Sequence, residues 1–140
     1  MTTLSTTTTI DASPRTVWAT LTSFELYHEW SERIQGIEGQ ARVGAKLAIR
    51  QQARPRRFTA RVIEAVDEHR LVWRAGIPWV FTGEHAFVLE PEGPSVRLEQ
   101  RESFRGLAVR IFGAPRGWEH NFATFGEALR RRAENVAARR

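Results

Sequence analysis

His85 and Glu102 are the two side chains whose chemical types and predicted positions suit proton transfer. They fall on two alternating stretches, 81–89 and 96–104, separated by a turn at Pro91-Glu92-Gly93-Pro94. Residues paired across a hairpin have a nearly constant sum, so residue 85 pairs near residues 100–102 and the two side chains could hydrogen-bond. A histidine held by a carboxylate suits a general base, and a buried carboxyl suits a general acid. The pair predicts either aldol cyclisation or dehydration chemistry, or a structural His–Glu pair in the core.

Bulky apolar side chains surround this pair on the inner face of the sheet, as the alternation of apolar and polar residues predicts. Rings are large and rigid, so a concave sheet lined by them cannot close everywhere on a helix. Any single ring suits an ordinary core equally well, but His85, Gln100 and Glu102 on the same face would be costly in a dry core unless each found a partner. A ligand cavity is the simpler explanation. Its predicted wall comprises Phe58, Val62, Trp73, Phe81, Phe87, Leu98, Gln100, Phe104, Trp118, Phe122 and Phe125, with Trp30 and Trp79 at the mouth.

The sequence does not contain the residues that other kinds of reactive site require. The absence of cysteine excludes disulfides, thiolate metal sites and a cysteine nucleophile. No spacing of His, Asp and Glu suggests a metal site. The sequence also has no phosphate-binding glycine loop and no serine with an evident base. We therefore expect no metal and no cofactor, and a small hydrophobic molecule as the partner.

The elements that must position these side chains follow from periodicity. Residues 5–10 predict a first strand, Ser13-Pro14 begin a short helix, and residues 24–30 form a second helical segment. Period-two alternation then runs from about residue 33 to 104, with one strand ending near Arg42 and the next spanning 46–52. From Trp118 the spacing becomes helical for about six turns. This order predicts an α+β fold in which a curved antiparallel sheet of about seven strands wraps around a long C-terminal helix.

The same order of elements resembles the START-like (SRPBCC) superfamily, in particular its polyketide cyclase/dehydrase-like members. The resemblance covers roughly residues 7–131. It is carried by Ile10-Asp11-Ala12-Ser13-Pro14, Tyr27-His28-Glu29-Trp30, Leu71-Val72-Trp73, Phe81-Thr82-Gly83-Glu84-His85-Ala86-Phe87 and Glu102-Ser103-Phe104-Arg105-Gly106. The resemblance implies the helix-grip fold (β-α-α-β6-α) and an internal cavity whose usual occupants are hydrophobic ligands. It carries over no catalytic set, because the superfamily has none in common.

The basic charge of the chain allows a third function besides ligand binding and catalysis, namely interaction with a protein or RNA. The net charge is +5, and the basic residues are 20 arginines and one lysine. Clusters at Arg54, Arg56 and Arg57 and at Arg130–Arg132 would suit a protein- or RNA-interaction surface if they joined. Most arginines alternate with acids, which favours an ordinary solvated surface and disfavours nucleic acid as a partner.

Length and hydropathy set the remaining expectations. A chain of 140 residues suits a single domain over 1–140. Its N-terminal stretch has no apolar region of the kind that signal peptides carry, and no run approaches the ~18 apolar residues of a membrane span. We expect a cytoplasmic protein, as a monomer or a homodimer.

Overall fold

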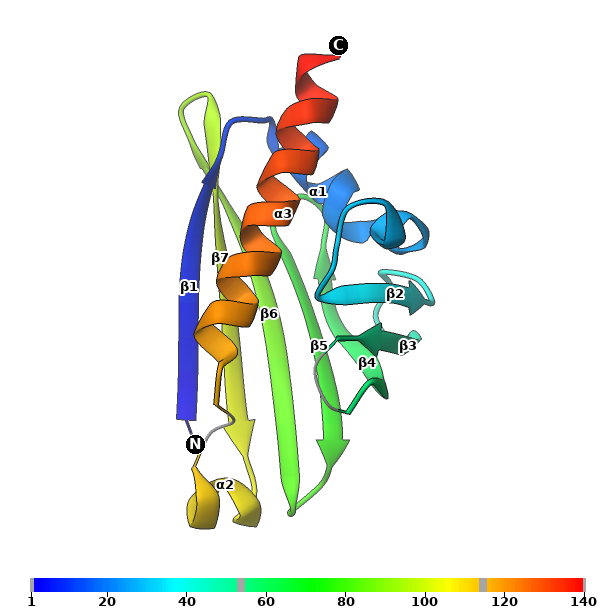
Figure 1. Ribbon diagram of the computed structural model, residues 1–140, viewed down its shortest axis with the longest axis vertical. Helices are drawn as coiled ribbons and strands as arrows, with labels where there is room; N and C mark the ends of the chain where they lie inside the picture. The colour runs from blue at the N-terminus through cyan, green and yellow to red at the C-terminus, as the bar shows by residue number, and fades with distance from the viewer. Residues whose placement is uncertain (1, 53–54, 114–115, 140) are drawn as a thin grey trace.

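Seven antiparallel strands form one curved sheet in the computed structural model, which describes residues 2–52, 55–113 and 116–139 (Figure 1). The strand order is β1-β7-β6-β5-β4-β3-β2, and β2 and β3 lie crosswise to the long strands. The strands are β1 (Thr2–Ile10), β2 (Ile34–Glu38), β3 (Lys46–Gln51), β4 (Arg57–Val66), β5 (Arg70–Ile77), β6 (Phe81–Glu92) and β7 (Ser95–Arg105).

Two short helical segments follow β1, as the sequence predicts. Helix α1 (Pro14–Thr22) begins where Ser13 accepts a hydrogen bond from the Thr16 amide, and Pro14 occupies the first helical position. The segment η1 (Phe24–Glu29) is a 3₁₀ helix whose Phe24 and Tyr27 are buried. The Tyr27 hydroxyl donates to the Leu21 carbonyl at 2.5 Å, which ties η1 to α1.

Strands β6 and β7 form the long hairpin expected from the alternation. His85 lies directly opposite Glu102 in the register, as the constant sum requires. Along β7, Val96, Leu98 and Gln100 are buried while their neighbours are half-buried, so this face points into the molecule. The sequence therefore fixes which side chains of this hairpin lie on the inner face.

Helix α3 (Trp118–Ala138) lies across the concave face of the sheet (Figure 1). It buries Phe125, Leu129 and Ala133 in the core. Gly126 lies so close to β1 that a Cβ atom there would meet the Thr8 hydroxyl oxygen at 2.6 Å. The sheet and this helix form the helix-grip α+β fold that the sequence predicts.

Two local predictions need correction. Strand β2 ends at Glu38 and not near Arg42, because Gly39 adopts a φ of +137° and turns the chain. An additional helix, α2 (Leu107–Phe112), follows β7 where the sequence analysis places no element. In the part of the chain that the structure describes, no helix is long and apolar enough to cross a membrane.

Candidate functional site

A cavity of about 370 Å³ lies between the sheet and the first turns of α3. Strands β5, β6 and β7 supply one wall, α3 supplies the opposite wall, and the start of β2 and the β3–β4 connection border it. A volume of this size accommodates a small organic molecule. Its lining residues are Arg33, Ile34, Gln51, Pro55, Phe58, Trp73, Ala75, Gly76, Phe81, Gly83, His85, Gln100, Glu102, Asn121, Phe122 and Phe125.

Two stacked phenylalanine rings pack against the imidazole of His85. The Phe87 ring stacks on it with centroids 4.2 Å apart, and the Phe122 ring of α3 stacks with centroids 4.7 Å apart. Trp73 on β5 packs against the same imidazole, with ring centroids 5.6 Å apart. This packing fixes the ring plane, so His85 presents one edge to the cavity.

Glu102 faces His85 across the β6–β7 ladder without hydrogen-bonding to it. The His85 Nδ1 and Glu102 Oε2 atoms are 3.8 Å apart, which is beyond hydrogen-bond distance. The hydrogen bond that the sequence analysis allows is therefore not formed, because the stacked rings set the position of the imidazole. The two groups remain neighbours on the cavity wall.

Burial keeps both groups uncharged at neutral pH. Burial lowers the pKa of His85 to about 3, and a weaker hydrogen-bonding interaction with the Gln100 side chain opposes this shift. That contact falls short of the distance and angle of a full hydrogen bond, so neither side chain satisfies the other. Burial raises the pKa of Glu102 to about 8, and the negative charge of Glu84 raises it further. At pH 7 the cavity thus contains a neutral imidazole beside a protonated carboxyl group.

Three polar atoms on this wall lack a hydrogen-bond partner among the described residues: His85 Nε2, Gln100 Oε1 and Glu102 Oε2. The Gln100 amide nitrogen donates to the Phe122 carbonyl at 2.9 Å, which leaves its oxygen as an acceptor. The protonated Glu102 offers an O–H donor. Buried polar groups are normally hydrogen-bonded, so these atoms are available to a polar group from outside the chain.

The structure brings most of the predicted wall to one place. Besides the two titratable residues, the cavity is lined by the predicted Phe58, Trp73, Phe81, Gln100, Phe122 and Phe125. The fully or nearly fully buried Val62, Phe87, Leu98 and Phe104 lie outside the lining and belong to the packed interior around it. Trp118 contacts Phe122 at 5.7 Å, also outside the lining.

Neither tryptophan expected at the mouth lies on the cavity wall. Trp79 is 90% exposed on the turn between β5 and β6 and is not a lining residue, so its place at the mouth stays a prediction. Trp30 is half-buried against Tyr27 and Phe125 and borders a separate depression beside α3. Strand parity predicts neither position, because Trp30 and Trp79 lie outside the strands.

Several lining residues were not predicted. Ala75 is two residues beyond Trp73 on the same strand face, and Asn121 precedes Phe122 on the helix, so spacing offered a signal for both. Arg33, Ile34 and Gln51 come from β2 and β3 and their flanks. Their approach depends on how far the sheet curls, which periodicity does not encode.

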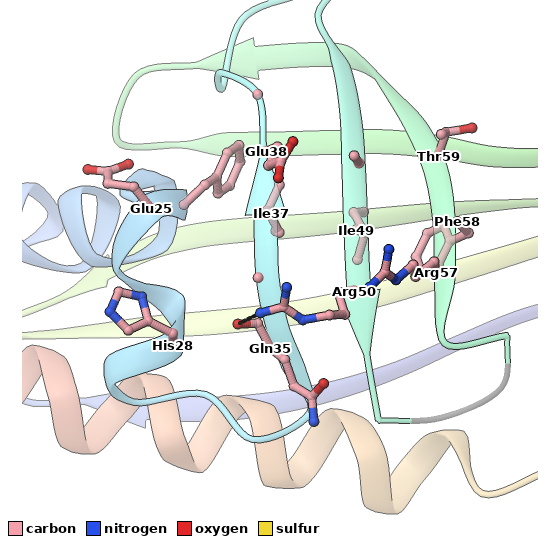
Figure 2. A pocket seen from close by; sticks show the side chains of 14 residues that line it. Glu25, His28, Gln35, Ile37, Glu38, Ile49, Arg50, Arg57, Phe58 and Thr59 are labelled. Atoms are coloured by element: carbon pink, nitrogen blue, oxygen red, sulfur yellow. Dashed lines mark hydrogen bonds between the residues drawn. The ribbon is translucent and has the colours of Figure 1, made fainter.

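A second, larger concavity of about 930 Å³ runs over β2, β3 and β4 beside η1 (Figure 2). Its lining mixes charged side chains such as Glu25, Glu38, Arg50 and Arg57 with Ile37 and Ile49. The Arg50 guanidinium extends across β2 to the Gln35 carbonyl, 3.4 Å away. The charged side chains of this broad groove can hydrogen-bond to water. The cavity under α3 instead contains buried polar atoms that lack a hydrogen-bond partner among the described residues. We therefore place the candidate site in the cavity.

No group of three or more His, Cys, Asp or Glu side chains that could hold a metal ion occurs in residues 2–52, 55–113 and 116–139. The polar groups of the cavity are one imidazole, one carboxyl and amides, together with Arg33 at its border. This set suits hydrogen bonding and proton transfer to an organic molecule.

A curved seven-stranded sheet that grips a long C-terminal helix around a cavity defines a START-like protein. A family model described as polyketide cyclase / dehydrase and lipid transport matches residues 1–139. The chain belongs to this family.

Solved structures share the fold at low sequence identity. A START superfamily protein from Mycobacterium smegmatis has a TM-score of 0.74 at 20% identity, covering 96% of this chain and 98% of that chain. A hypothetical protein from Helicobacter pylori has a TM-score of 0.77 at 14% identity, covering 94% and 88%. Norcoclaurine synthase from Thalictrum flavum, in complex with dopamine and hydroxybenzaldehyde, has a TM-score of 0.72 at 12% identity, covering 96% and 87%. No curated protein matches the chain.

Proposed function

We propose that this protein binds a small aromatic or otherwise apolar molecule that carries a hydroxyl group, in the cavity between the sheet and α3. The observation that carries the proposal is the set of three buried polar atoms that lack a partner among the described residues, on a wall made mainly of apolar side chains. The apolar surface accounts for affinity, and the polar atoms account for orientation.

A hydroxyl group matches the polar wall better than a carbonyl group does. A hydroxyl can donate to Gln100 Oε1 and accept from the protonated Glu102, whereas a carbonyl oxygen can only accept. The stacking of Phe87 and Phe122 on the imidazole also leaves an edge of His85 toward the cavity. Norcoclaurine synthase, which shares the fold, was solved with two phenolic molecules, dopamine and hydroxybenzaldehyde. A phenol is therefore the first class of guest to test.

The first test fills the cavity. Ala75→Phe places a ring in the proposed binding volume, and Ala48→Phe adds the same ring in the outer groove as a matched control. A phenolic library is screened by thermal shift against the wild type and both variants. A guest at 100 times its dissociation constant stabilises the wild type by about 2.7 kcal/mol. We expect Ala48→Phe to keep the shift and Ala75→Phe to lose it; equal shifts in all three proteins would contradict the proposal.

The second test separates the polar wall from the apolar wall. Glu102→Met removes the carboxyl group at similar volume, so it should weaken a phenol about tenfold, the effect of one hydrogen bond of roughly 1.4 kcal/mol. The same change should leave an alkylbenzene of equal size bound as tightly or more tightly. Calorimetric titration with the two guests measures both effects. An equal loss for both would mean that Glu102 contributes only to folding.

A second candidate function is acid catalysis in the same cavity, as in a cyclase or dehydratase. The observation that favours it is the protonated carboxyl of Glu102, a group able to donate a proton to a carbonyl or departing hydroxyl oxygen. The lowered pKa of His85 makes its imidazole a weak base in the empty cavity, so Glu102 is the stronger catalytic candidate of the predicted pair. Catalysis requires Glu102→Gln to abolish turnover while guest affinity stays nearly unchanged. Parallel loss of both would assign the cavity to binding alone.

The arginine clusters receive less support as an interaction surface. Arg130 pairs with Glu127 and Glu134, and Arg132 pairs with Glu29 at 2.5 Å. These contacts neutralise the helical cluster internally. Arg54 lies outside the described residues. We therefore do not propose nucleic acid as a partner.

A further inference from the structure

The turn between β5 and β6 lies at the same end of the molecule as α2 (Figure 1). Six exposed apolar side chains come from these two segments. The turn between β5 and β6 contributes three of them and α2 contributes the other three. Trp79 is 90% exposed and Phe112 is 83% exposed, values typical of surface charges rather than of large rings. We name residues 77–80 and 107–112 the apolar tip. Its exposed apolar members are Ile77, Trp79, Val80, Leu107, Ile111 and Phe112.

Backbone hydrogen bonds join the two halves of the apolar tip into one unit. The first amides of α2, Leu107 and Ala108, donate to the carbonyls of Trp79 and Val80, each at 2.9 Å. Gly106 permits this approach, since a Cβ atom there would lie 2.4 Å from the Val80 carbonyl oxygen and its φ is +115°. The amides that a helix start leaves without intrahelical partners therefore fix the turn. The exposed rings are held in place rather than presented on a loose loop.

Trp79 has an unusual backbone conformation, which hydrogen bonds of the turn hold: its carbonyl accepts from the Leu107 amide at 2.9 Å, and the Val80 amide donates to the Ile77 carbonyl at 3.1 Å. The Trp79 φ of +69° lies in the left-handed region, which is unfavourable for a bulky residue. Within the described chain its side chain gains little in return, because it is nearly fully exposed. Strained, exposed aromatic residues of this kind are typical of contact sites. An external surface is therefore the partner that this geometry suits.

The charge around the apolar tip selects the kind of surface. Residues 76–82 and 105–113 contain Arg105 and Arg110 and no Asp or Glu, and Arg116 follows shortly. A symmetric contact between two copies would bring the same arginines together, which is unfavourable. A bilayer with anionic phospholipid instead attracts arginine to its head groups and accepts tryptophan at the interface.

We propose that the apolar tip docks the protein on bilayers that contain anionic phospholipid, with Trp79 and Phe112 entering the interface and Arg110 and Arg116 contacting head groups. The apolar tip continues the cavity wall, since Gly76 and Phe81 line the cavity and directly flank the turn. Docking would bring the cavity close to the lipid surface. The proposal does not depend on cavity occupancy.

Vesicle binding tests the proposal directly on the full chain. Flotation is measured with pure phosphatidylcholine vesicles and with vesicles that contain 30% phosphatidylglycerol, at low and high salt. We expect binding to the anionic vesicles that weakens with salt, and a blue shift of tryptophan emission that Trp79→Phe removes. Absence of binding to both vesicle types would overturn the proposal. Equal binding to both would overturn the choice of an anionic surface.

Variants assign the effect to the apolar tip. The double change Trp79→Ser with Phe112→Ser should reduce vesicle affinity at least tenfold with an unchanged melting temperature, because both side chains are exposed. Arg110→Gln should reduce it about fivefold. Val43→Ser is the matched control, since Val43 is 60% exposed away from the apolar tip. A loss as large in Val43→Ser would contradict the assignment.

Two further measurements separate this proposal from its competitors. If the wild type is a dimer without lipid and the double variant is a monomer, the apolar tip is a self-association surface and the proposal is wrong. The double variant should keep the thermal shift given by a phenolic guest. If the protein floats with anionic vesicles but no phenolic guest shifts its melting temperature, the proposed cavity function is wrong and the docking proposal is supported.

Discussion

The two halves of α3 face the same sheet with opposite results. From the middle of the helix toward its C-terminus, Gly126 brings the helix into contact with Thr8 of β1, and Leu129 and Ala133 are fully buried. Toward its N-terminus, Phe122 and Phe125 line a cavity and Trp118 is only half-buried. The helix closes on the sheet where its side chains are small or fully interdigitated and stands off where they are rings.

This difference indicates that one half of the helix serves mainly to stabilise the fold and that the other half forms part of the candidate site. The closed half excludes water and holds the helix on the sheet, so close packing determines which residues it contains. The open half retains unsatisfied polar atoms and two strongly shifted pKa values, features that cost folding free energy and persist at functional sites. Mutations should therefore act on stability in one half and on binding in the other.

The largest expected effect comes from opening the closed half. Leu129→Ala should lower the free energy of unfolding by about 2–5 kcal/mol, because it removes a fully buried side chain and leaves a void. Phe122→Ala should cost less than half as much, since it enlarges a cavity that already exists. Urea unfolding of both variants measures the contrast. Equal losses would mean that the two halves are packed alike.

The next effect should come from pH and should originate in the open half. The pKa of Glu102 rises from 4.5 to about 8 on folding, so the native state holds an extra proton and stability falls as pH rises through this range. The pKa of His85 falls from 6.5 to about 3, so stability falls as pH drops below 6.5. Between pH 4.5 and 6.5 the two slopes cancel. We predict a plateau there, with losses of about 1.4 kcal/mol per pH unit on either side.

Variants at the two positions assign the slopes. Glu102→Gln should flatten the alkaline side and replace the plateau by a rise that continues to pH 6.5, because only the His85 slope remains. His85→Phe should flatten the acid side and replace the plateau by a fall that begins at pH 4.5, because only the Glu102 slope remains. Urea midpoints from pH 3 to 9 measure both. An alkaline slope that survives in Glu102→Gln would show that another group titrates and that Glu102 is not buried as a neutral acid.

Sequence periodicity predicted what depends on local spacing. The alternation along 96–104 placed Gln100 and Glu102 on the inner face, and the turn at Gly93 and Pro94 set His85 opposite Glu102. It could not give the 3.8 Å separation of that pair, which the stacked rings determine. Nor could it give the contribution of Arg33 and Ile34 to the cavity, because the curl of the sheet sums small twists over many strands. Helix α2 escaped prediction because its six residues are too few to show a period.

The smallest effect tests why the closed half closes. A Cβ at Gly126 would lie 2.6 Å from the Thr8 hydroxyl oxygen and 3.0 Å from the Gln100 amide nitrogen. Alanine gains roughly 1 kcal/mol over glycine inside a helix, while overpacking costs about 1–3 kcal/mol, so Gly126→Ala should be destabilising by about 1 kcal/mol.

Gly36→Ala on β2 is the matched control for Gly126→Ala, because its Cβ would meet only the movable Arg50 guanidinium at 3.1 Å. Its expected effect is neutral or slightly stabilising, since alanine loses less backbone entropy than glycine on folding. Thermal unfolding compares the two variants. If Gly126→Ala proved as stable as Gly36→Ala, the helix would have room to move away from β1, and the closed half would owe its closure to Leu129 and Ala133 rather than to the close approach at Gly126.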